Sequence, residues 1–234
     1  MQTQTLASPP RRITDLVNAK AGGADVRLKI DFEILPTDFH HRSQPFKAYI
    51  FLTRYSGSVD GKAFAFRKCY ARGCPNNLCT HVSQAVRIAN RYLQRDFQRL
   101  KTAGLTVEDR LFRLDEMVVK FEHLHEQDQP AMTIPDLVGL AAGGKALQVT
   151  VDLAYLPAVE HFANEEKAQT FLSGEFTAVS DERTYQCHRC FACYPSDEEQ
   201  AEKPVAVRVA NARLELVYTA FQRDGIVCRP QYFS

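Results

Sequence analysis

Several residue types that mark specialised protein classes are scarce or missing in this chain. Its 234 residues contain no tryptophan and only three methionines, and glycine and proline occur 11 times each. The 29 lysines and arginines nearly balance the 28 aspartates and glutamates, for a formal net charge of +1. This composition excludes collagen-like repeats, wholesale disorder and a polybasic chain that wraps nucleic acid.

Long apolar runs are also missing. No segment approaches the roughly 18 consecutive apolar residues of a membrane-spanning helix, and residues 1–12 lack the apolar core of a signal peptide. We therefore expect a soluble, cytoplasmic protein, which at this length can fold without disulfide bonds. Glycine-rich phosphate loops and the Gly-x-Ser-x-Gly elbow of hydrolases are absent, so the familiar nucleotide-binding and hydrolytic activities have no support.

The sequence does contain an internal repeat, at an offset of 121 residues. Residues 85–90 (Ala-Val-Arg-Ile-Ala-Asn) recur at 206–211 as Ala-Val-Arg-Val-Ala-Asn. Residues 47–53 match 167–173 at offset 120, which requires a one-residue slip in a loop. Shorter pairs at offset 121 are Ile30-Asp31 with Val151-Asp152, Leu35-Pro36 with Leu156-Pro157, Asp60 with Asp181, and Lys68-Cys69 with Arg189-Cys190. Because the matches are collinear, we interpret residues from about 26 to 103 and from about 147 to 223 as two copies of one unit.

Each copy shows the same succession of patterns. In the first copy, apolar residues alternate from Val26 to Ile34, which predicts a strand that ends at Pro36. Two more strands are expected at about 46–55 and 63–69, followed by a helix from about 82 that ends at Gly104. The second copy predicts strands near 147–156, 169–178 and 183–190, and a helix over 199–223. The predicted fold class is α+β: a duplicated strand–strand–strand–helix unit, with two small antiparallel sheets that carry helices and a pseudo-twofold axis between them.

These patterns divide the chain into four parts. We expect a flexible tail over residues 1–24, a first repeat unit over 25–104, a helical connector over 105–146 and a second repeat unit over 147–234. Within the connector, capping and periodicity predict a helix over about 106–126 and a shorter helix near 135–142 that ends at Gly143-Gly144.

Six of the seven cysteines lie in two tight groups, at the same point of each repeat. We place both groups in the loop between the third strand and the helix. The groups are Cys69, Cys74 and Cys79, followed by His81, and Cys187, Cys190 and Cys193. Thiols spaced this closely can converge on one soft metal ion or cluster without a large loop-closure penalty. Disulfide bonds are disfavoured by the odd cysteine count and the expected compartment, and inert buried cysteine explains Cys228 better than it explains three thiols within seven residues.

Two kinds of metal centre fit these spacings. The Cys-x2-Cys-x2-Cys run of residues 187–193 resembles the run with which ferredoxins hold three corners of a [4Fe–4S] cube. The resemblance covers seven residues, and where a ferredoxin continues with Cys-Pro this run ends Cys193-Tyr194-Pro195. It implies a fourth ligand from His188, Cys228 or the first group. Cys69, Cys74, Cys79 and His81 could instead supply a zinc site. We favour iron–sulfur over zinc and leave open whether the groups share one centre.

Arginines recur every fourth residue along the predicted first helix, on the side opposite its apolar stripe. They are Arg87, Arg91, Arg95 and Arg99. Such a ridge can bind phosphates or an acidic partner, although a solvated helix face is the commoner origin of this pattern. The second copy does not keep the ridge, and its acidic segment could pair with the ridge within the chain or between subunits. That segment contains Asp197, Glu198, Glu199 and Glu202.

Taken together, these features predict a metal–thiolate protein. The leading hypothesis is an iron–sulfur protein for electron transfer or redox sensing, with a redox or regulatory protein as partner. The alternative is a zinc-stabilised, non-enzymatic binding module for a protein or RNA partner. Nothing in the sequence identifies catalytic residues, and we expect that the chain is not an enzyme by itself; homo-oligomers remain compatible with both hypotheses.

Overall fold

The structure is a computed structural model that describes residues 8–41, 44–73, 78–113, 115, 133–162, 165–181, 183–196 and 199–234. Its helices are α1 (Ile13–Ala21), α2 (Leu78–Thr102), α4 (Ile134–Ala142) and α5 (Glu199–Arg223). Its strands are β1 (Val26–His41), β2 (Gln44–Val59), β3 (Lys62–Gly73), β4 (Gln148–Phe162), β5 (Glu165–Ser180), β6 (Arg183–Pro195) and β7 (Val227–Cys228). No helix within these ranges is long and apolar enough to cross a bilayer.

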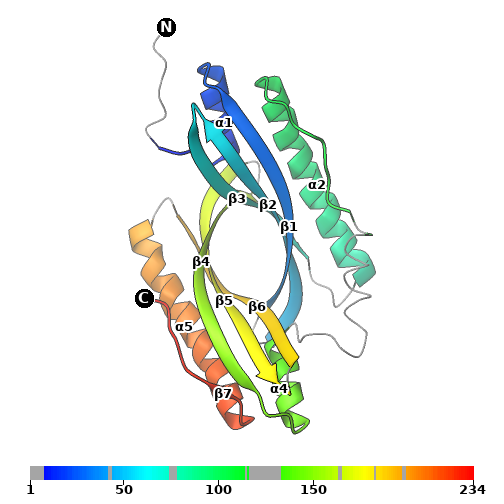
Figure 1. The fold of residues 1–234 in the computed structure, drawn as a ribbon, viewed down its shortest axis with the longest axis vertical. Coiled ribbons are helices and arrows are strands. Elements are labelled where there is room, and N and C mark those ends of the chain that lie inside the picture. Colours follow the sequence, from blue (N-terminus) through cyan, green and yellow to red (C-terminus); the bar gives the residue numbers. More distant parts are fainter. Residues whose placement is uncertain are drawn as a thin grey trace.

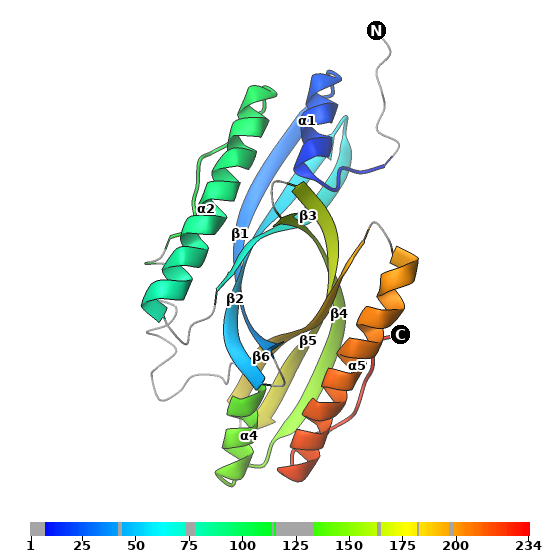
Figure 2. The same cartoon turned by 180° about the vertical axis from the view of Figure 1, so that it is seen from behind.

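The strands form one seven-stranded sheet and not the two small sheets that the sequence predicted. β1–β2–β3 and β4–β5–β6 are antiparallel meanders, as expected. The meanders are joined in parallel fashion where Asp38 of β1 meets Arg189 of β6, and again where Lys68 and Cys69 of β3 meet Val159 and Glu160 of β4. The sheet therefore closes on itself, and Figures 1 and 2 show its strands as a ring with α2 and α5 on opposite sides.

Strand length explains the difference from the prediction. The sequence predicted that β1 ends at Pro36, but β1 continues to His41 and pairs with β2 along its whole length. Proline is tolerated on a strand edge that makes no ladder hydrogen bonds, and the only pairing of β1 with β6 is at Asp38, beyond Pro36. The additional residues carry β1 across to the other meander.

Structural details recur along the chain at the spacing of the sequence repeat. α1 begins at 13 and α4 at 134, and β2 and β5 begin at 44 and 165. Lys47 pairs with Asp38 and Ala168 pairs with Val159, so both members of these pairs are 121 residues apart and the structure needs no slip to offset 120. Asp60 and Asp181 both adopt positive φ angles, of 47° and 48°, in the turns that lead to β3 and β6. A β-bulge interrupts the pairing of β2 with β3 beside Phe51/Leu52, and another interrupts the pairing of β5 with β6 beside Leu172/Ser173.

An asparagine on each long helix fixes a segment that follows it. Asn90 donates a side-chain hydrogen bond to the Phe112 carbonyl (2.9 Å) and accepts one from the Phe112 backbone N–H (2.8 Å). Asn211 makes the same two bonds with Phe233, both at 2.9 Å. The two phenylalanine side chains are buried, so both helices hold an extended segment against the sheet.

The N-terminal and connecting segments correct two predictions. α1 lies within the predicted flexible tail, and Ile13 and Leu16 are fully buried against the end of the first meander. The sequence did not predict α1, because a helix of nine residues contains too few apolar repeats to give a clear periodic pattern. Residues 106–113 form neither helix nor strand, and Asn90 holds Phe112 beside α2. Residues 116–126 of that predicted helix lie outside the described residues. α4 forms as predicted and is capped by Thr133, whose hydroxyl oxygen accepts a hydrogen bond from the Asp136 backbone N–H.

The apolar core has separate layers outside and inside the ring. α2 covers the outer face of the first meander, and α4 and α5 cover that of the second. A smaller cluster lies between the meanders, on the inner face of the strands. Its buried members are Ile50, Leu52, Cys69, Ala158, Phe171 and Cys190. Alternation along each strand therefore assigns neighbouring residues to different layers.

Candidate functional site

The structure places the cysteines on strands, where the sequence predicted loops. Cys69 lies in β3, and β6 extends far enough to contain Cys187, Cys190 and Cys193. Cys74 lies outside the described residues. Cys79 and His81 belong to the first turn of α2, but their side chains also lie outside the described part of the structure.

The thiols of β6 do not converge. Cys187 is buried in the layer under α5, whereas Cys190 is buried in the cluster between the meanders. Residues three apart on a strand face opposite sides, which accounts for this separation. Cys193 is exposed. Among the residues that the structure describes, no group of three or more His, Cys, Asp or Glu side chains is placed to hold a metal ion.

The structure instead brings together one cysteine from each group. Cys69 and Cys190 occupy equivalent positions in β3 and β6, and both are at most 4% exposed within the cluster between the meanders. Their thiols lie 4.0 Å and 3.8 Å from the carbonyl oxygens of Ala71 and Ala192, respectively. Each of these contacts spans a β-bulge, at Tyr70 in β3 and at Phe191 in β6.

The two other ligand candidates are chemically different from these cysteines. Burial lowers the pKa of His188 to about 4, so its imidazole is neutral at pH 7. Burial raises the pKa of the Cys228 thiol to about 11, so that side chain is a thiol and not a thiolate at pH 7. Cys228 lies in β7, on the far edge of the second meander from β6.

A buried ionic network lies on the other face of β3. The Lys68 ammonium is 2.7 Å from the Asp96 carboxylate of α2, and both side chains are fully buried. The Tyr70 hydroxyl donates a hydrogen bond of 2.6 Å to the same carboxylate and also contacts the hydroxyl of Tyr55. Burial, followed by the neighbouring Tyr55 and Asp96, raises the pKa of Tyr70 well above its usual value.

The sequence did not predict this network, although one residue of α2 indicates it. Asp96 interrupts the apolar stripe of α2 between Leu93 and Phe97, where a carboxylate is buried only if it is paired. The second unit has no equivalent network: Tyr55, Tyr70 and Asp96 correspond to Phe176, Phe191 and Val217. Lys68 corresponds to Arg189, which is also buried and has its guanidinium 5.3 Å from the Phe191 ring centre.

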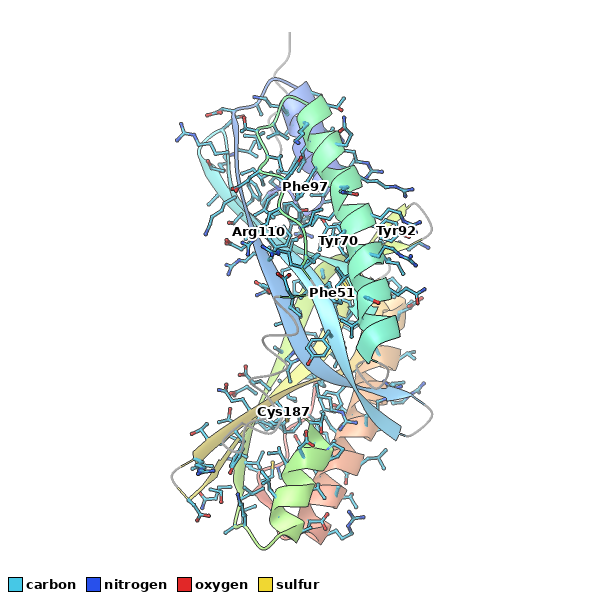
Figure 3. The ribbon with its side chains drawn as sticks, turned by 90° about the vertical axis from the view of Figure 1, so that its right-hand side faces the viewer. Phe51, Tyr70, Tyr92, Phe97, Arg110 and Cys187 are labelled. Atoms are coloured by element: carbon cyan, nitrogen blue, oxygen red, sulfur yellow. The ribbon has the colours of Figure 1, made fainter. Side chains whose placement is uncertain are left out.

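The arginine ridge is present on α2 as predicted. Arg87, Arg91, Arg95 and Arg99 are all exposed. Tyr92 is half-buried, and the Arg91 and Arg95 guanidinium groups lie 5.6 Å and 5.7 Å from its ring centre. Figure 3 shows Phe51 and Tyr70 on the sheet side of α2 and Tyr92 at its far edge.

The exposed charge of α2 is almost entirely positive. Asp96 is the only acidic residue between Leu78 and Thr102, and it points into the core toward Lys68. Lys101 adds a further cation, which pairs with Asp109 (2.5 Å). Glu202, which belongs to the acidic segment that the sequence offered as a partner of the ridge, is exposed on α5, and α5 lies across the ring from α2. Asp197 and Glu198 lie outside the described residues.

Comparisons of the chain with protein-family models, with curated proteins and with solved structures found no match.

Proposed function

We propose that this chain is a non-enzymatic binding module, built by internal duplication, whose helix α2 binds RNA through its phosphates. The observation that carries the proposal is the row of exposed arginines on α2, on a helix whose only carboxylate is buried. Positive charge without exposed negative charge attracts a polyanion, because each phosphate that is neutralised releases a counterion.

The duplication is supported by features that sequence similarity alone does not impose. The turns at Asp60 and Asp181, the β-bulges and the asparagine bonds all recur at one spacing. The two parallel contacts between the meanders are equivalent as well, since Asp38 meets Arg189 where Val159 meets Lys68. Paired contacts of this kind are expected of two units related by a pseudo-twofold axis.

The duplication also supplies an internal control for the ridge. The helix α5 occupies the same position on the second unit, but Arg91, Arg95 and Arg99 are replaced there by Ala212, Leu216 and Ala220. The fold therefore does not require arginine at these positions. Because only the first copy has the arginines, a function of that surface explains them better than a requirement of folding.

The geometry of α2 favours a nucleic-acid strand. Residues four apart on a helix rise by about 6 Å, so the ridge from Arg87 to Arg99 extends over about 18 Å. Two of its guanidinium groups lie beside the Tyr92 ring. Unpaired RNA bases stack on arginine guanidinium planes and on aromatic rings. An acidic protein partner would use only the positive charge, so the Tyr92 ring favours RNA.

The experiment is a fluorescence-anisotropy titration of a 12-nucleotide, single-stranded oligouridylate. We expect Arg91→Gln/Arg95→Gln to weaken binding at least tenfold at 100 mM salt. The matched control is Arg208→Gln, which removes the exposed arginine of α5 that corresponds to Arg87, and it should change the affinity less than twofold. Equal affinity of all three proteins would refute the proposal, as would a preference for polyglutamate over the RNA.

A metal–thiolate centre is the second candidate, because Cys69 and Cys190 share one buried cluster. Cys74 and Cys79 follow β3 closely in the sequence, and with these two residues they would provide four thiolates for an iron–sulfur cluster or for zinc. In the cluster form the protein would serve electron transfer or redox sensing. In the zinc form the metal would only stabilise the binding module.

Metal and sulfide analysis of anaerobically purified protein tests this candidate. We expect iron with sulfide, or zinc, in the wild-type protein and loss of the metal in Cys69→Ala/Cys190→Ala. Cys228→Ala is the matched control, because its thiol lies outside the shared cluster. Metal-free wild-type protein, or equal metal content in the double variant, would rule out a centre on this pair.

A further inference from the structure

A cavity at one junction of the two units is lined by three arginines. It has a volume of about 670 Å³ and lies where β3 meets β4. Arg11 and Arg12 reach it from the start of α1, and Arg67 reaches it from β3. Its volume falls within the range of small-molecule sites, about 300–1,000 Å³.

The cavity carries an excess of positive charge. Asp15 is the only acidic residue among the described residues of its lining, and its carboxylate accepts hydrogen bonds from the backbone N–H groups of Arg11 (2.9 Å) and Arg12 (3.1 Å). Arg67 donates through Nε to Glu33 at 3.3 Å. Glu33 thus engages one edge of this guanidinium, whose planar fork carries four further N–H donors. Arginine forks of this kind match phosphate and carboxylate oxygens.

Polar and apolar groups share the rest of the lining. Within the described residues, the buried Gln169 Oε1 accepts no hydrogen bond, and leaving a buried acceptor unsatisfied is unfavourable. The Thr170 and Ser196 hydroxyls, 3.1 Å apart, also belong to the lining. Phe66 and Pro157 provide apolar surface. A ligand that donates a hydroxyl hydrogen bond to Gln169 and packs a flat apolar group against Phe66 fits both the polar and the apolar part of the lining.

The other junction shows that the fold does not require this charge. The positions equivalent to Arg11, Arg12 and Arg67 are Met132, Thr133 and His188, and burial lowers the pKa of His188 to about 4. Gln169 corresponds to Ala48. The cationic and amide groups are therefore particular to the junction of β3 with β4.

From these observations the geometry points to a binding site for a small organic anion, in which a phosphate or carboxylate is carried on a hydroxylated body with a flat apolar face. The anionic group lies between Arg67 and the arginines at the start of α1, whose helix dipole adds to the attraction. The hydroxyl groups face Gln169 and Thr170. The site is separate from the ridge on α2 and does not depend on RNA binding.

Isothermal titration calorimetry with three matched probes tests the site. The probes are adenosine 5′-monophosphate, adenosine 5′-carboxylate and uncharged adenosine. We expect at least one anion to bind the full chain at least tenfold more tightly than adenosine does. The preferred anion identifies phosphate or carboxylate as the natural group. Absence of heat with both anions up to 5 mM, or equal affinity for adenosine, would overturn the proposal.

Variants locate the binding on the chain. Arg67→Gln and Arg11→Gln should each weaken the preferred anion at least tenfold; Arg11 is exposed, so its replacement leaves the core intact. Arg91→Gln/Arg95→Gln should leave anion binding unchanged, which separates this site from the RNA surface. If both Arg67→Gln and Arg11→Gln bind like the wild-type protein, the anion is not held in this cavity.

Discussion

Replacing Lys68 by methionine should strongly destabilise the first unit. Lys68 and Asp96 are fully buried and 2.7 Å apart. The variant would leave the Asp96 carboxylate in the core with the Tyr70 hydroxyl as a hydrogen-bond donor and without a buried countercharge, because its remaining cationic partner, Arg99, is exposed. Breaking a buried ion pair by removing one partner typically costs about 3–5 kcal/mol. For a chain of this length, that loss lowers Tm by roughly 6–20 °C.

Removing both charges should cost much less than removing one. The second unit already has Val217 where the first has Asp96, so this part of the fold accepts an apolar side chain at that position. We expect Lys68→Met/Asp96→Val to lose less than about 2 kcal/mol, because no unpaired charge remains buried. The coupling between the two sites should therefore be large and favourable.

Urea unfolding, followed by circular dichroism, measures these differences. The control is Arg99→Gln, since the exposed Arg99 lies 3.8 Å from Asp96 but is only a surface partner, which predicts a change below about 1 kcal/mol. Our reasoning is refuted if Lys68→Met costs less than about 1 kcal/mol, or if the double variant loses the sum of the two single losses.

Two further predictions concern pH and the repeated asparagines. Burial lowers the folded-state pKa of His188 to about 4. Between about pH 6.5 and 4 the unfolded chain therefore binds a proton that the folded chain does not bind. The free energy of unfolding should fall by up to about 3 kcal/mol as the pH falls through this window. Urea unfolding at several pH values should show that His188→Gln lacks this component; an unchanged pH profile would contradict the assignment. Asn90→Ala and Asn211→Ala each remove two hydrogen bonds to a phenylalanine backbone and should each cost about 1–3 kcal/mol in the same assay; a loss in only one variant would argue against equivalent roles.

Local sequence patterns predicted the individual helices and strands better than the way in which the strands join into one sheet. Alternation and helical periodicity located both meanders and both long helices. They also placed the ends of those helices before Gly104 and Gly225, where the φ angles are +82° and +72°. The union of the meanders into one sheet was not predictable, because it rests on a few parallel pairs around Asp38 and Lys68 that leave no periodic signal.

The candidate sites show the same limit. The arginines of α2 were found because a helix face can be read from steps of four. The cysteine groups were assigned to loops because close thiol spacing suggested a wrapped metal. β6 continues past the bulge at Phe191 to Pro195, so the strand contains all three cysteines of this group, and strand alternation places Cys187 and Cys190 on opposite faces. The arginine cavity combines Arg11 with Gln169, which are too distant in sequence to form a motif.

The salt dependence of oligouridylate binding tests the central claim most directly. If the four arginines of α2 each neutralise a phosphate, the logarithm of the affinity should fall with that of salt with a slope of about −2.8. Affinity would then drop about 50-fold between 50 and 200 mM salt, and Arg91→Gln/Arg95→Gln should halve the slope to about −1.4. An affinity that stays constant over this range, or a slope that the double variant leaves unchanged, would contradict phosphate binding by α2.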